Sequence, residues 1–316
     1  MAAKLSSPFA GGKRYRTFNS YLREIFGCRV HKVSLDAGFT CPNRDGTCGT
    51  GGCIYCDNDG FSYNTARGPA PLAEQLEAGL HHMRRRFGAE KFIAYFQAFS
   101  STYAPPDRLK ETYDIIRRYP EIVGLFISTR PDCLDEAALA LLASYREQYL
   151  TWLEVGLQSA SDSTLKRINR GHSVADFREA VSRAADHGLP VCAHVILGLP
   201  GESEKEMLAT AGLLAGLKVQ GVKIHLLHIL TGTLLAKQFA EQPFHLLGPE
   251  EYAGLAADFL ERLPPGVVVQ RVAVDVPRNR LVGPLWCTDK RAAVAAVDRE
   301  LERRGSCQGA LFGDAP

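Results

Sequence analysis

Hydrophobic residues in this chain gather into short continuous runs that are separated by longer amphipathic stretches. Six runs rich in valine, isoleucine, leucine and phenylalanine have the length of β-strands. They lie at 32–35, 91–99, 122–128, 149–157, 190–199 and 222–230. Because these runs are continuous rather than alternating, they are typical of parallel strands that are covered on both faces.

The stretches between the runs have the periodicity of helices. We expect helices near 70–87, 106–119, 134–147, 174–187 and 203–218. Several of them close with helix-ending residues, as in Phe87-Gly88 and Tyr119-Pro120. Strands and helices that alternate in this way predict an α/β fold with a parallel sheet, since right-handed crossovers need the intervening helices. The pattern alone leaves open a doubly wound sheet, a full barrel or a partial barrel.

The pattern changes after residue 240. Residues 243–266 predict a helix closed by prolines, and 267–276 predict a strand. Residues 289–304 alternate in charge sign and predict an amphipathic helix. We interpret 241–316 as an α+β extension of the core.

Composition is that of an ordinary globular protein, with 46% hydrophobic and 23% charged residues in a chain of 316. The formal net charge of +2 neither demands nor excludes a nucleic-acid partner. The N-terminus lacks the apolar stretch of a signal peptide, and no run approaches the roughly 18 apolar residues of a membrane helix. We therefore expect a cytoplasmic protein without a membrane partner, in a compartment where thiols stay reduced.

Four of the nine cysteines crowd into a long glycine-rich loop after the first predicted strand: Cys41, Cys48, Cys53 and Cys56. Loops of this length in a compact domain are usually functional, and thiolates suit zinc or an iron–sulfur cluster. A closed zinc site usually uses two close pairs of ligands, whereas only Cys53 and Cys56 form a CxxC pair here. A thioredoxin-like redox pair would leave the two extra cysteines unexplained.

A [4Fe–4S] cluster held by three thiolates leaves one iron free for a small molecule. That iron could bind S-adenosylmethionine (SAM) through its amine and carboxylate, and reduction of the cluster would then release a 5′-deoxyadenosyl radical. A fourth thiolate would close the open coordination position. The spacing of the cysteines favours this chemistry over zinc only modestly.

The segments RYRTFNSYLREIFGCRVHKVSLDAGFTCPNRDG at 14–46 and GGCIYC at 51–56 resemble the YhcC/YtqA family of radical SAM proteins. Relatives of that family include the catalytic subunit of Elongator and the oxygen-independent coproporphyrinogen oxidases. The family's Cx₁₁CxxC motif assigns the cluster to Cys41, Cys53 and Cys56 and leaves Cys48 without a role.

The resemblance extends from Arg14 to Gly309 and implies a partial (β/α)₆ barrel of the TIM-like, radical SAM type. We expect the barrel over 30–240, an N-terminal extension over 1–29, and the C-terminal extension of 241–316 packed on the barrel.

Catalytic groups of such barrels lie at the C-terminal ends of the strands. The second strand ends near Gln97, where radical SAM proteins bind the SAM amino group through backbone carbonyls. Phe96-Gln97-Ala98 replaces their usual Gly-Gly-Glu. The third strand ends in STRPD at 128–132, where Elongator-like relatives have ETRPD, so Ser128 could give SAM a hydrogen bond but no carboxylate.

Glu154 lies inside the apolar fourth strand. A carboxylate there costs several kcal/mol unless it is paired or faces a polar cavity. The period of two places it on one face with Trp152, Gly156 and Gln158. One interpretation is a buried structural salt bridge. We favour the other, in which this face lines the barrel and Glu154 acts at the site as a catalytic and SAM-binding group.

Two further motifs complete the predicted SAM site. GLQS at 156–159 and INRGH at 168–172 resemble segments of the coproporphyrinogen oxidases, which implies that Gln158 and Arg170 contact SAM. A guanidinium suits the SAM carboxylate, which it can hold with two hydrogen bonds. The fifth strand ends in LGLPGE, where glycine lets the backbone approach the adenine, so we include Gly198 and Leu199. His194 is either a satisfied core histidine or a SAM contact inside the barrel.

The substrate follows from the resemblance rather than from the residues. Members of the YtqA type are linked to the tRNA wobble uridine and to conversion of its carboxymethylaminomethyl group to aminomethyl, which implies tRNA as partner. The chemistry also needs an electron donor, expected to be a protein of flavodoxin or ferredoxin type. The alternatives are a radical SAM enzyme acting on a small metabolite or protein, and a zinc-bearing nucleic-acid binding module.

Overall fold

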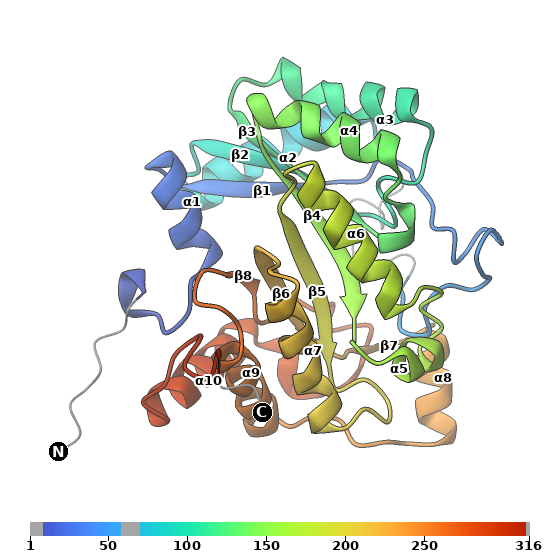
Figure 1. The fold of residues 1–316 in the computed structure, drawn as a ribbon, viewed down its shortest axis with the longest axis vertical. Coiled ribbons are helices and arrows are strands. Elements are labelled where there is room, and N and C mark those ends of the chain that lie inside the picture. Colours follow the sequence, from blue (N-terminus) through green and yellow to red (C-terminus); the bar gives the residue numbers. More distant parts are fainter. Residues whose placement is uncertain (1–8, 58–69, 314–316) are drawn as a thin grey trace.

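The computed structural model describes residues 9–57 and 70–313, so parts of all three predicted segments (1–8, 58–69 and 314–316) lie outside the described residues. Seven parallel strands form one curved, open sheet in the order β1-β2-β3-β4-β5-β6-β8 (Figure 1). The strands are β1 Val30–Leu35, β2 Lys91–Phe96, β3 Ile122–Thr129, β4 Leu150–Gln158, β5 Val191–Leu197, β6 Gly221–Leu226 and β8 Val268–Arg271. This arrangement confirms the predicted α/β fold and the partial barrel.

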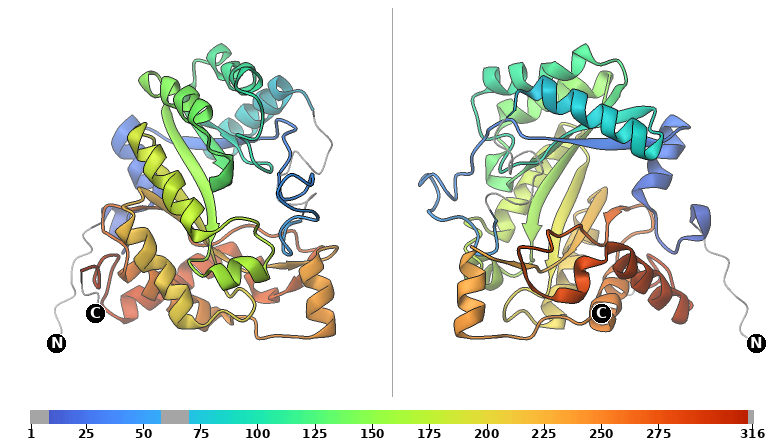
Figure 2. Two further views of the ribbon diagram at one scale, coloured as in Figure 1. Left: turned by 45° about the vertical axis from the view of Figure 1, so that its right-hand side comes forward. Right: turned by 180° about the vertical axis from the view of Figure 1, so that it is seen from behind.

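Helices connect the strands and cover the outer face of the curved sheet (Figure 2). They are α2 Leu72–Phe87, α3 Pro106–Tyr113, α4 Glu136–Ser144, the short α5 Asp162–Arg167, α6 Val174–Asp186 and α7 Glu204–Gly216. α6 begins with a capping box in which Ser173 and Asp176 satisfy each other's backbone N–H groups. α2 ends at Gly88, whose φ of 60° is a left-handed conformation that glycine adopts without strain.

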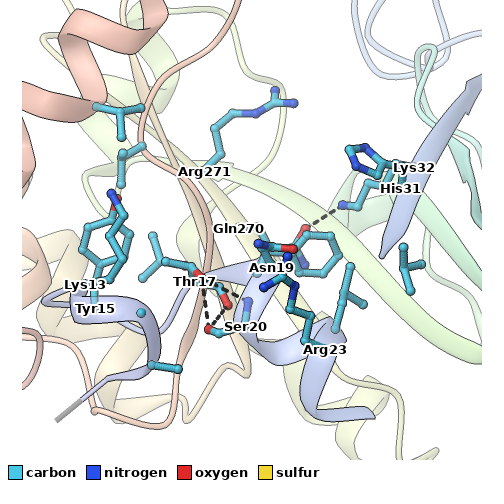
Figure 3. Close-up of a pocket in the computed structure, with 18 of the residues that line it drawn as sticks. Lys13, Tyr15, Thr17, Asn19, Ser20, Arg23, His31, Lys32, Gln270 and Arg271 are labelled. Atoms are coloured by element: carbon cyan, nitrogen blue, oxygen red, sulfur yellow. Dashed lines mark hydrogen bonds between the residues drawn. The ribbon is translucent and has the colours of Figure 1, made fainter. Parts of the chain in front are cut away.

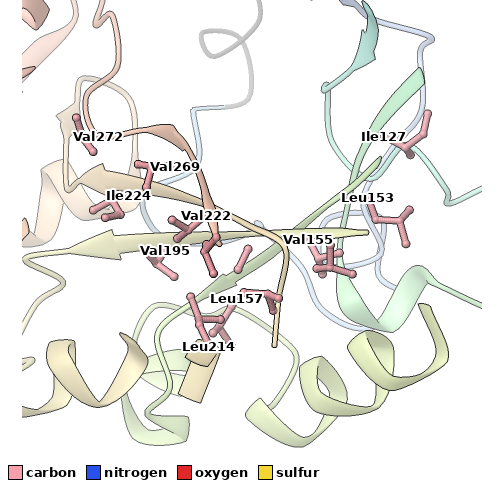
Figure 4. Packing of buried hydrophobic residues seen from close by; sticks show 14 of the residues in the cluster. Ile127, Leu153, Val155, Leu157, Val195, Leu214, Val222, Ile224, Val269 and Val272 are labelled. Atoms are coloured by element: carbon pink, nitrogen blue, oxygen red, sulfur yellow. The ribbon is translucent and has the colours of Figure 1, made fainter. Parts of the chain in front are cut away.

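The main core lies between the outer face of the sheet and these helices. Leu153, Val155 and Leu157 alternate along β4 toward the helices and are completely buried. Val195, Val222 and Leu214 continue the same layer across β5, β6 and α7 (Figure 4). The alternate residues of each strand therefore point into the barrel.

Helix α1, Phe18–Phe26, closes the end of the barrel at which the strands begin. Its buried Leu22 packs in one cluster with Ile93 of β2, Phe126 of β3 and Trp152 of β4. The segment before α1 also extends the open edge of the sheet, because the Val269 N–H donates to the Arg16 carbonyl at 2.8 Å. An aromatic layer thus fills one end of the barrel and leaves the other end to polar residues.

The predicted strand over 222–230 is two strands in the structure. β6 ends at Leu226, and β7, Ile229–Leu230, pairs antiparallel with β9, Leu281–Gly283, in a separate small sheet. Both halves of the run are buried, so its hydrophobicity gives no sign of the break. Helix α8, Leu234–Glu241, follows β7 and reaches the cysteine loop, where the Leu235 N–H donates to the Ile54 carbonyl at 2.8 Å.

The C-terminal residues form helix α9, Pro249–Glu261, then β8 and helix α10, Lys290–Arg303. β8 pairs in parallel with β6 and forms the edge strand of the sheet. Gln308 ties both termini together, since it donates to Val267 O at 2.8 Å and accepts from Arg16 N at 2.9 Å. The division of the chain at 30 and 240 stays a prediction. Within the described residues, none of the helices has the length and apolarity to cross a bilayer.

We expect Leu22→Ala to destabilise the fold by about 2–5 kcal/mol, because it opens a cavity under the barrel. Leu22 is 2% exposed, whereas Ile25 of the same helix is 46% exposed. Ile25→Ala is the matched control and should change the free energy of unfolding by less than about 0.5 kcal/mol. Urea denaturation measures both. Equal effects would mean that α1 does not close the barrel.

Candidate active site

The cysteine loop follows β1 and lies over the C-terminal ends of the strands. The Cys56 N–H donates to the Cys53 carbonyl at 2.9 Å and closes the CxxC turn. Cys53 is buried, Cys41 and Cys56 are half-buried, and Cys48 is exposed. Burial and the nearby Cys53 thiol raise the pKa of Cys56 to about 12, so this thiol needs a metal partner to ionise near neutral pH.

The loop that joins α5 to α6 holds the cysteine loop in place. The Ile54 N–H donates to the Ile168 carbonyl at 3.0 Å. The Asn169 side chain donates to the Gly52 carbonyl at 2.8 Å, and the Asn43 side chain donates back to the Asn169 carbonyl at 2.6 Å. These reciprocal bonds fix the position of the cysteines relative to β4.

Arg170 contacts Cys53 of the cysteine loop and the backbone of β4. Its Nη1 lies 3.6 Å from Cys53 Sγ, and its Nη2 donates to the Gly156 carbonyl at 2.8 Å. A Cβ at Gly156 would lie 2.6 Å from both Arg170 Nη2 and Gln158 Nε2. Glycine at this position therefore makes room for the guanidinium, a requirement that the sequence motif does not reveal.

Arg130 is a positioning residue that sequence analysis missed, although it belongs to the STRPD motif. It is 2% exposed and holds Asp132 through two hydrogen bonds of 2.9 and 2.7 Å. Its remaining Nη1 donates to the Arg170 carbonyl at 2.7 Å. The signal that could have found it is a charged pair two residues apart at the end of an apolar strand.

The predicted SAM contacts from the strand ends are brought to the same end of the barrel. Gln97 directly follows β2, Ser128 belongs to the end of β3, and Gln158 ends β4 with a φ of 77°. All three are half-buried. Gln158 folds back beside Gly156 and therefore lies next to Arg170.

The fifth strand gives a different result for Gly198 and Leu199. The Leu199 side chain is buried in an apolar cluster with Ile54. Gly198 has a φ of 86°, and a Cβ there would lie 3.1 Å from a methyl group of Leu247. Backbone conformation and packing thus account for this glycine without a ligand, and contact of either residue with adenine stays a prediction.

Glu154 lies one layer deeper in the barrel and is completely buried. Its Oε1 accepts from Lys32 of β1, and its Oε2 accepts from Lys223 of β6 and lies 3.0 Å from His194 Nε2. Burial opposes ionisation, but the two ammonium groups outweigh it and hold the pKa of Glu154 well below its usual value. The residue is therefore salt-bridged and faces the barrel interior, and its role as a catalytic and SAM-binding group stays a prediction.

His194 is held in the same network rather than free. Burial and the neighbouring Lys223 lower the pKa of His194 to about 4, so its imidazole is neutral near pH 7. Lys223 also donates to the Tyr95 hydroxyl at 3.0 Å. Sequence analysis missed both lysines and the tyrosine, since each looks like an ordinary strand residue.

The residues around Cys53 fit an iron–sulfur cluster and a polar ligand beside it. Two N–H donors, Arg170 Nη1 and Asn43 Nδ2, point at the Cys53 sulfur, which suits a ligating thiolate. Arg170 Nε and Asn43 Oδ1 are buried without a partner, one a donor and one an acceptor. A bound molecule with both a carboxylate and an amine would satisfy them.

A profile described as the radical SAM superfamily matches residues 44–214, and one described as the radical SAM C-terminal domain matches residues 219–303. The chain belongs to the radical SAM superfamily. YtqA of Bacillus subtilis is 41% identical over 95% of this chain and 93% of its own length. YhcC of Escherichia coli is 39% identical over 95% and 96%. These matches confirm the predicted family.

More distant relatives share part of this radical SAM chain. A tRNA uridine(34) acetyltransferase of Dehalococcoides mccartyi is 32% identical over 49% of the chain and 34% of its own length. The structure of the archaeal Methanocaldococcus infernus Elp3 superposes with a TM-score of 0.66 at 20% identity, over 88% of the chain and 64% of that protein. The second match concerns the fold alone.

As a radical SAM enzyme, the protein uses a [4Fe–4S] cluster and SAM, which decides between cluster and zinc in favour of the cluster. Among residues 9–57 and 70–313, no group of three or more His, Cys, Asp or Glu side chains is arranged to hold one metal ion. A cluster offers each cysteine its own iron, so its ligands need not converge on one point.

We expect Gly156→Ala to weaken SAM binding about tenfold or more, because the new methyl group displaces the Arg170 guanidinium. Gly212→Ala is the control, since a Cβ at Gly212 in α7 meets no atom within 4 Å. It should leave SAM affinity unchanged and stabilise the helix by about 1 kcal/mol. Equilibrium binding of SAM to the reconstituted enzyme measures both. Unchanged affinity in Gly156→Ala would place Arg170 outside the SAM site.

Proposed function

We propose that this radical SAM enzyme modifies the wobble uridine of tRNA and converts a carboxymethylaminomethyl side chain to aminomethyl. The observation that carries the proposal is a basic groove that opens into the barrel between β1 and β8 (Figure 3). Its volume is about 1120 Å³, more than the roughly 300–1,000 Å³ of a typical small-molecule pocket. A macromolecular substrate that inserts one nucleotide matches this size.

Positively charged side chains are concentrated in the groove, whereas the chain as a whole is nearly neutral. It is lined by seven basic residues, Lys13, Arg23, Arg29, Lys32, Lys223, Arg271 and Lys290, and by one acidic residue, Glu24. Lys13 and Lys290 are paired with Asp298 and Asp275, and Lys32 and Lys223 share Glu154, so the arginines supply most of the unpaired charge. The formal net charge of the chain is only +2. A local excess of this kind attracts a polyanion and neutralises its phosphates.

Aromatic rings accompany the charges in the groove. His31 stacks on Phe87 with ring centroids 4.6 Å apart, and Arg29 Nη1 donates to the Phe87 carbonyl at 2.7 Å. Phe18 and Tyr15 line the same groove. Basic side chains interleaved with aromatic rings suit a nucleic acid whose bases are unstacked from their neighbours.

The proposed roles of the residues follow their positions. Cys41, Cys53 and Cys56 would hold the cluster, which when bound supplies a 5′-deoxyadenosyl radical from SAM. Arg170 donates a hydrogen bond toward Cys53 and keeps its Nε for the SAM carboxylate. Glu154 orients the two lysines of the barrel interior, since its two oxygens are engaged by Lys32 and Lys223.

The remaining predicted contacts, Gln97, Ser128, Gln158 and the backbone at 198–199, are assigned to the rim of the SAM site. They project from neighbouring strands at one end of the barrel, so a single ligand could touch several of them. His194 is assigned to the charged layer below that rim.

The relatives support the choice of tRNA. The Dehalococcoides mccartyi relative is a tRNA uridine(34) acetyltransferase, and its similarity covers about half of this chain. Loss of a hydrogen atom to the 5′-deoxyadenosyl radical and of one electron to the oxidised cluster would turn the N–CH2 unit of the side chain into an imine. Water would then cleave the imine into the aminomethyl group and glyoxylate, which breaks the C–N bond of the proposed conversion. Binding of a small metabolite or a protein would not by itself require a basic groove, so the groove favours tRNA over these alternatives.

We expect anaerobically reconstituted enzyme to form 5′-deoxyadenosine from SAM and to convert tRNA that carries 5-carboxymethylaminomethyluridine. Dithionite can replace the flavodoxin- or ferredoxin-type donor. Cys41→Ala should abolish deoxyadenosine formation, and Cys48→Ala should leave it intact. Chromatography of deoxyadenosine and mass spectrometry of tRNA nucleosides provide the readouts. Deoxyadenosine without tRNA conversion would reject the substrate while keeping the cofactor chemistry.

We also expect Arg23→Gln to weaken tRNA binding and to lower the slope of log affinity against log salt by about 1, as loss of one phosphate contact requires. Arg23 lines the groove and has no side-chain hydrogen bond or ion pair with another described residue. Arg303→Gln removes an exposed charge outside the groove and is the control. Filter binding across a salt series measures the slope. Identical slopes in both variants would place the tRNA elsewhere.

A further inference from the structure

We propose that Lys32, Lys223 and Arg271 form a binding site for a carboxylate of the substrate at the inner end of the groove. The site lies inside the barrel, where β1 lies across the opening from the neighbouring strands β6 and β8. It deepens the proposed function and rests on it in one respect, namely that the substrate enters through the groove.

The charges at this place do not balance. Both oxygens of Glu154 are already engaged, one by Lys32 and the other by Lys223. The Arg271 side chain has no hydrogen bond or ion pair with another described residue, yet its charge acts on both lysines. His194 is neutral near pH 7, so Glu154 is the one carboxylate named beside three basic side chains, Lys32, Lys223 and Arg271. One further anion would improve the balance.

The imbalance affects Lys223 directly. Burial lowers the pKa of Lys223 to about 7, and the charges of Lys32 and Arg271 act in the same direction against the attraction of Glu154. The other groups that face it are the Tyr95 hydroxyl, His194, His225 and the Cys192 thiol. An ammonium held at this cost is stabilised when an anion binds beside it.

Two buried polar atoms in the same region have no partner. Gln270 accepts from Lys32 Nζ at 2.6 Å through its Oε1, while its Nε2 is buried and unpaired (Figure 3). Nε2 of His225 on β6 is also buried and unpaired. An unsatisfied buried polar atom costs about 1–3 kcal/mol. A carboxylate oxygen could accept a hydrogen bond from Gln270 Nε2, and also from His225 Nε2 in the tautomer that has its proton there.

The walls of the site favour a carboxylate over a backbone phosphate. Lys32 Nζ lies 4.6, 4.7 and 4.4 Å from the ring centroids of Phe18, Tyr95 and Phe126. The Lys223 side chain is only 3% exposed. A terminal, planar anion can enter a narrow aromatic enclosure, whereas a phosphodiester has a ribose on each side. The low dielectric of such walls also strengthens each charge interaction.

The carboxylate site and the proposed SAM site are built on the same face of β4. Glu154 and Gly156 are two residues apart on the same face of β4, a rise of about 6.6 Å. Gly156 accepts from Arg170, which contacts Cys53. A carboxylate held at the lysine layer would thus place the atoms next to it one layer below SAM. The carboxymethylaminomethyl group ends in such a carboxylate.

The experiment compares two nucleosides that differ in this group. Calorimetry with SAM-loaded, reconstituted enzyme should give 5-carboxymethylaminomethyluridine an affinity about tenfold or more above that of 5-aminomethyluridine, as expected for charge-assisted hydrogen bonds. Arg271→Gln should remove most of the difference, and it leaves no buried carboxylate unpaired. Lys223→Gln is the second variant, and Arg303→Gln on α10 is the control that should keep the full difference.

A second measurement separates this inference from the proposed function. Potassium acetate should raise the melting temperature of the wild-type enzyme more than potassium phosphate or chloride at equal ionic strength, and Arg271→Gln should lose that rise. This result supports the carboxylate site even if tRNA is not the substrate. If the enzyme converts tRNA but binds both nucleosides equally, the inference is wrong and the function stands. A melting temperature that responds equally to acetate and phosphate also overturns it.

Discussion

The open barrel depends on one buried carboxylate that receives an ammonium group from each side of the opening. No backbone pairing joins β1 to β6 or β8 within the described residues, so the width of the barrel mouth has to be set by side chains. Glu154, on the central strand β4, accepts from Lys32 of β1 and from Lys223 of β6, and Lys32 also donates to Gln270 of β8. A buried ion pair is a weak source of stability, because desolvation offsets most of the attraction. It is, however, a directional contact that keeps polar space where apolar side chains would fill the interior.

Above this charged layer, the position of the cysteine loop depends on a second set of polar contacts. Arg130 holds the backbone of Arg170, and Arg170 contacts both Cys53 and Gly156. The interior is thus layered along the strands, with an aromatic plug under α1, then the charged layer, then the guanidinium and the cysteines. The plug closes the barrel, the charged layer suits a polar group of the substrate, and the layer of the cysteines suits the cofactors.

Segments near the two ends of the chain build the groove to which we assign the substrate of this radical SAM enzyme. The superfamily profile covers residues 44–214, yet the groove is lined mainly by residues 10–32 and 269–273, with Phe87 as its one residue inside that range. Gln308 and the bridge between Thr17 and Val269 hold these distant segments together. The cofactor chemistry and the groove therefore come from different parts of the sequence, which allows a shared catalytic half to serve different substrates.

The sequence by itself determined the α/β class, the parallel sheet and, through its resemblance, the partial barrel and the cofactors. Continuous apolar runs and helix-ending residues are local signals, and the cysteine motif is local too. Only the tertiary structure decided that the run over 222–230 divides into β6 and β7, that Gly156 makes room for Arg170, and that Leu199 lies in an apolar cluster. It also decided that Lys32 and Lys223 share one carboxylate while the charge of Arg271 acts on both lysines. These residues are far apart in sequence and each is ordinary in its own strand, so the charge imbalance between them exists only where the strands bring them together.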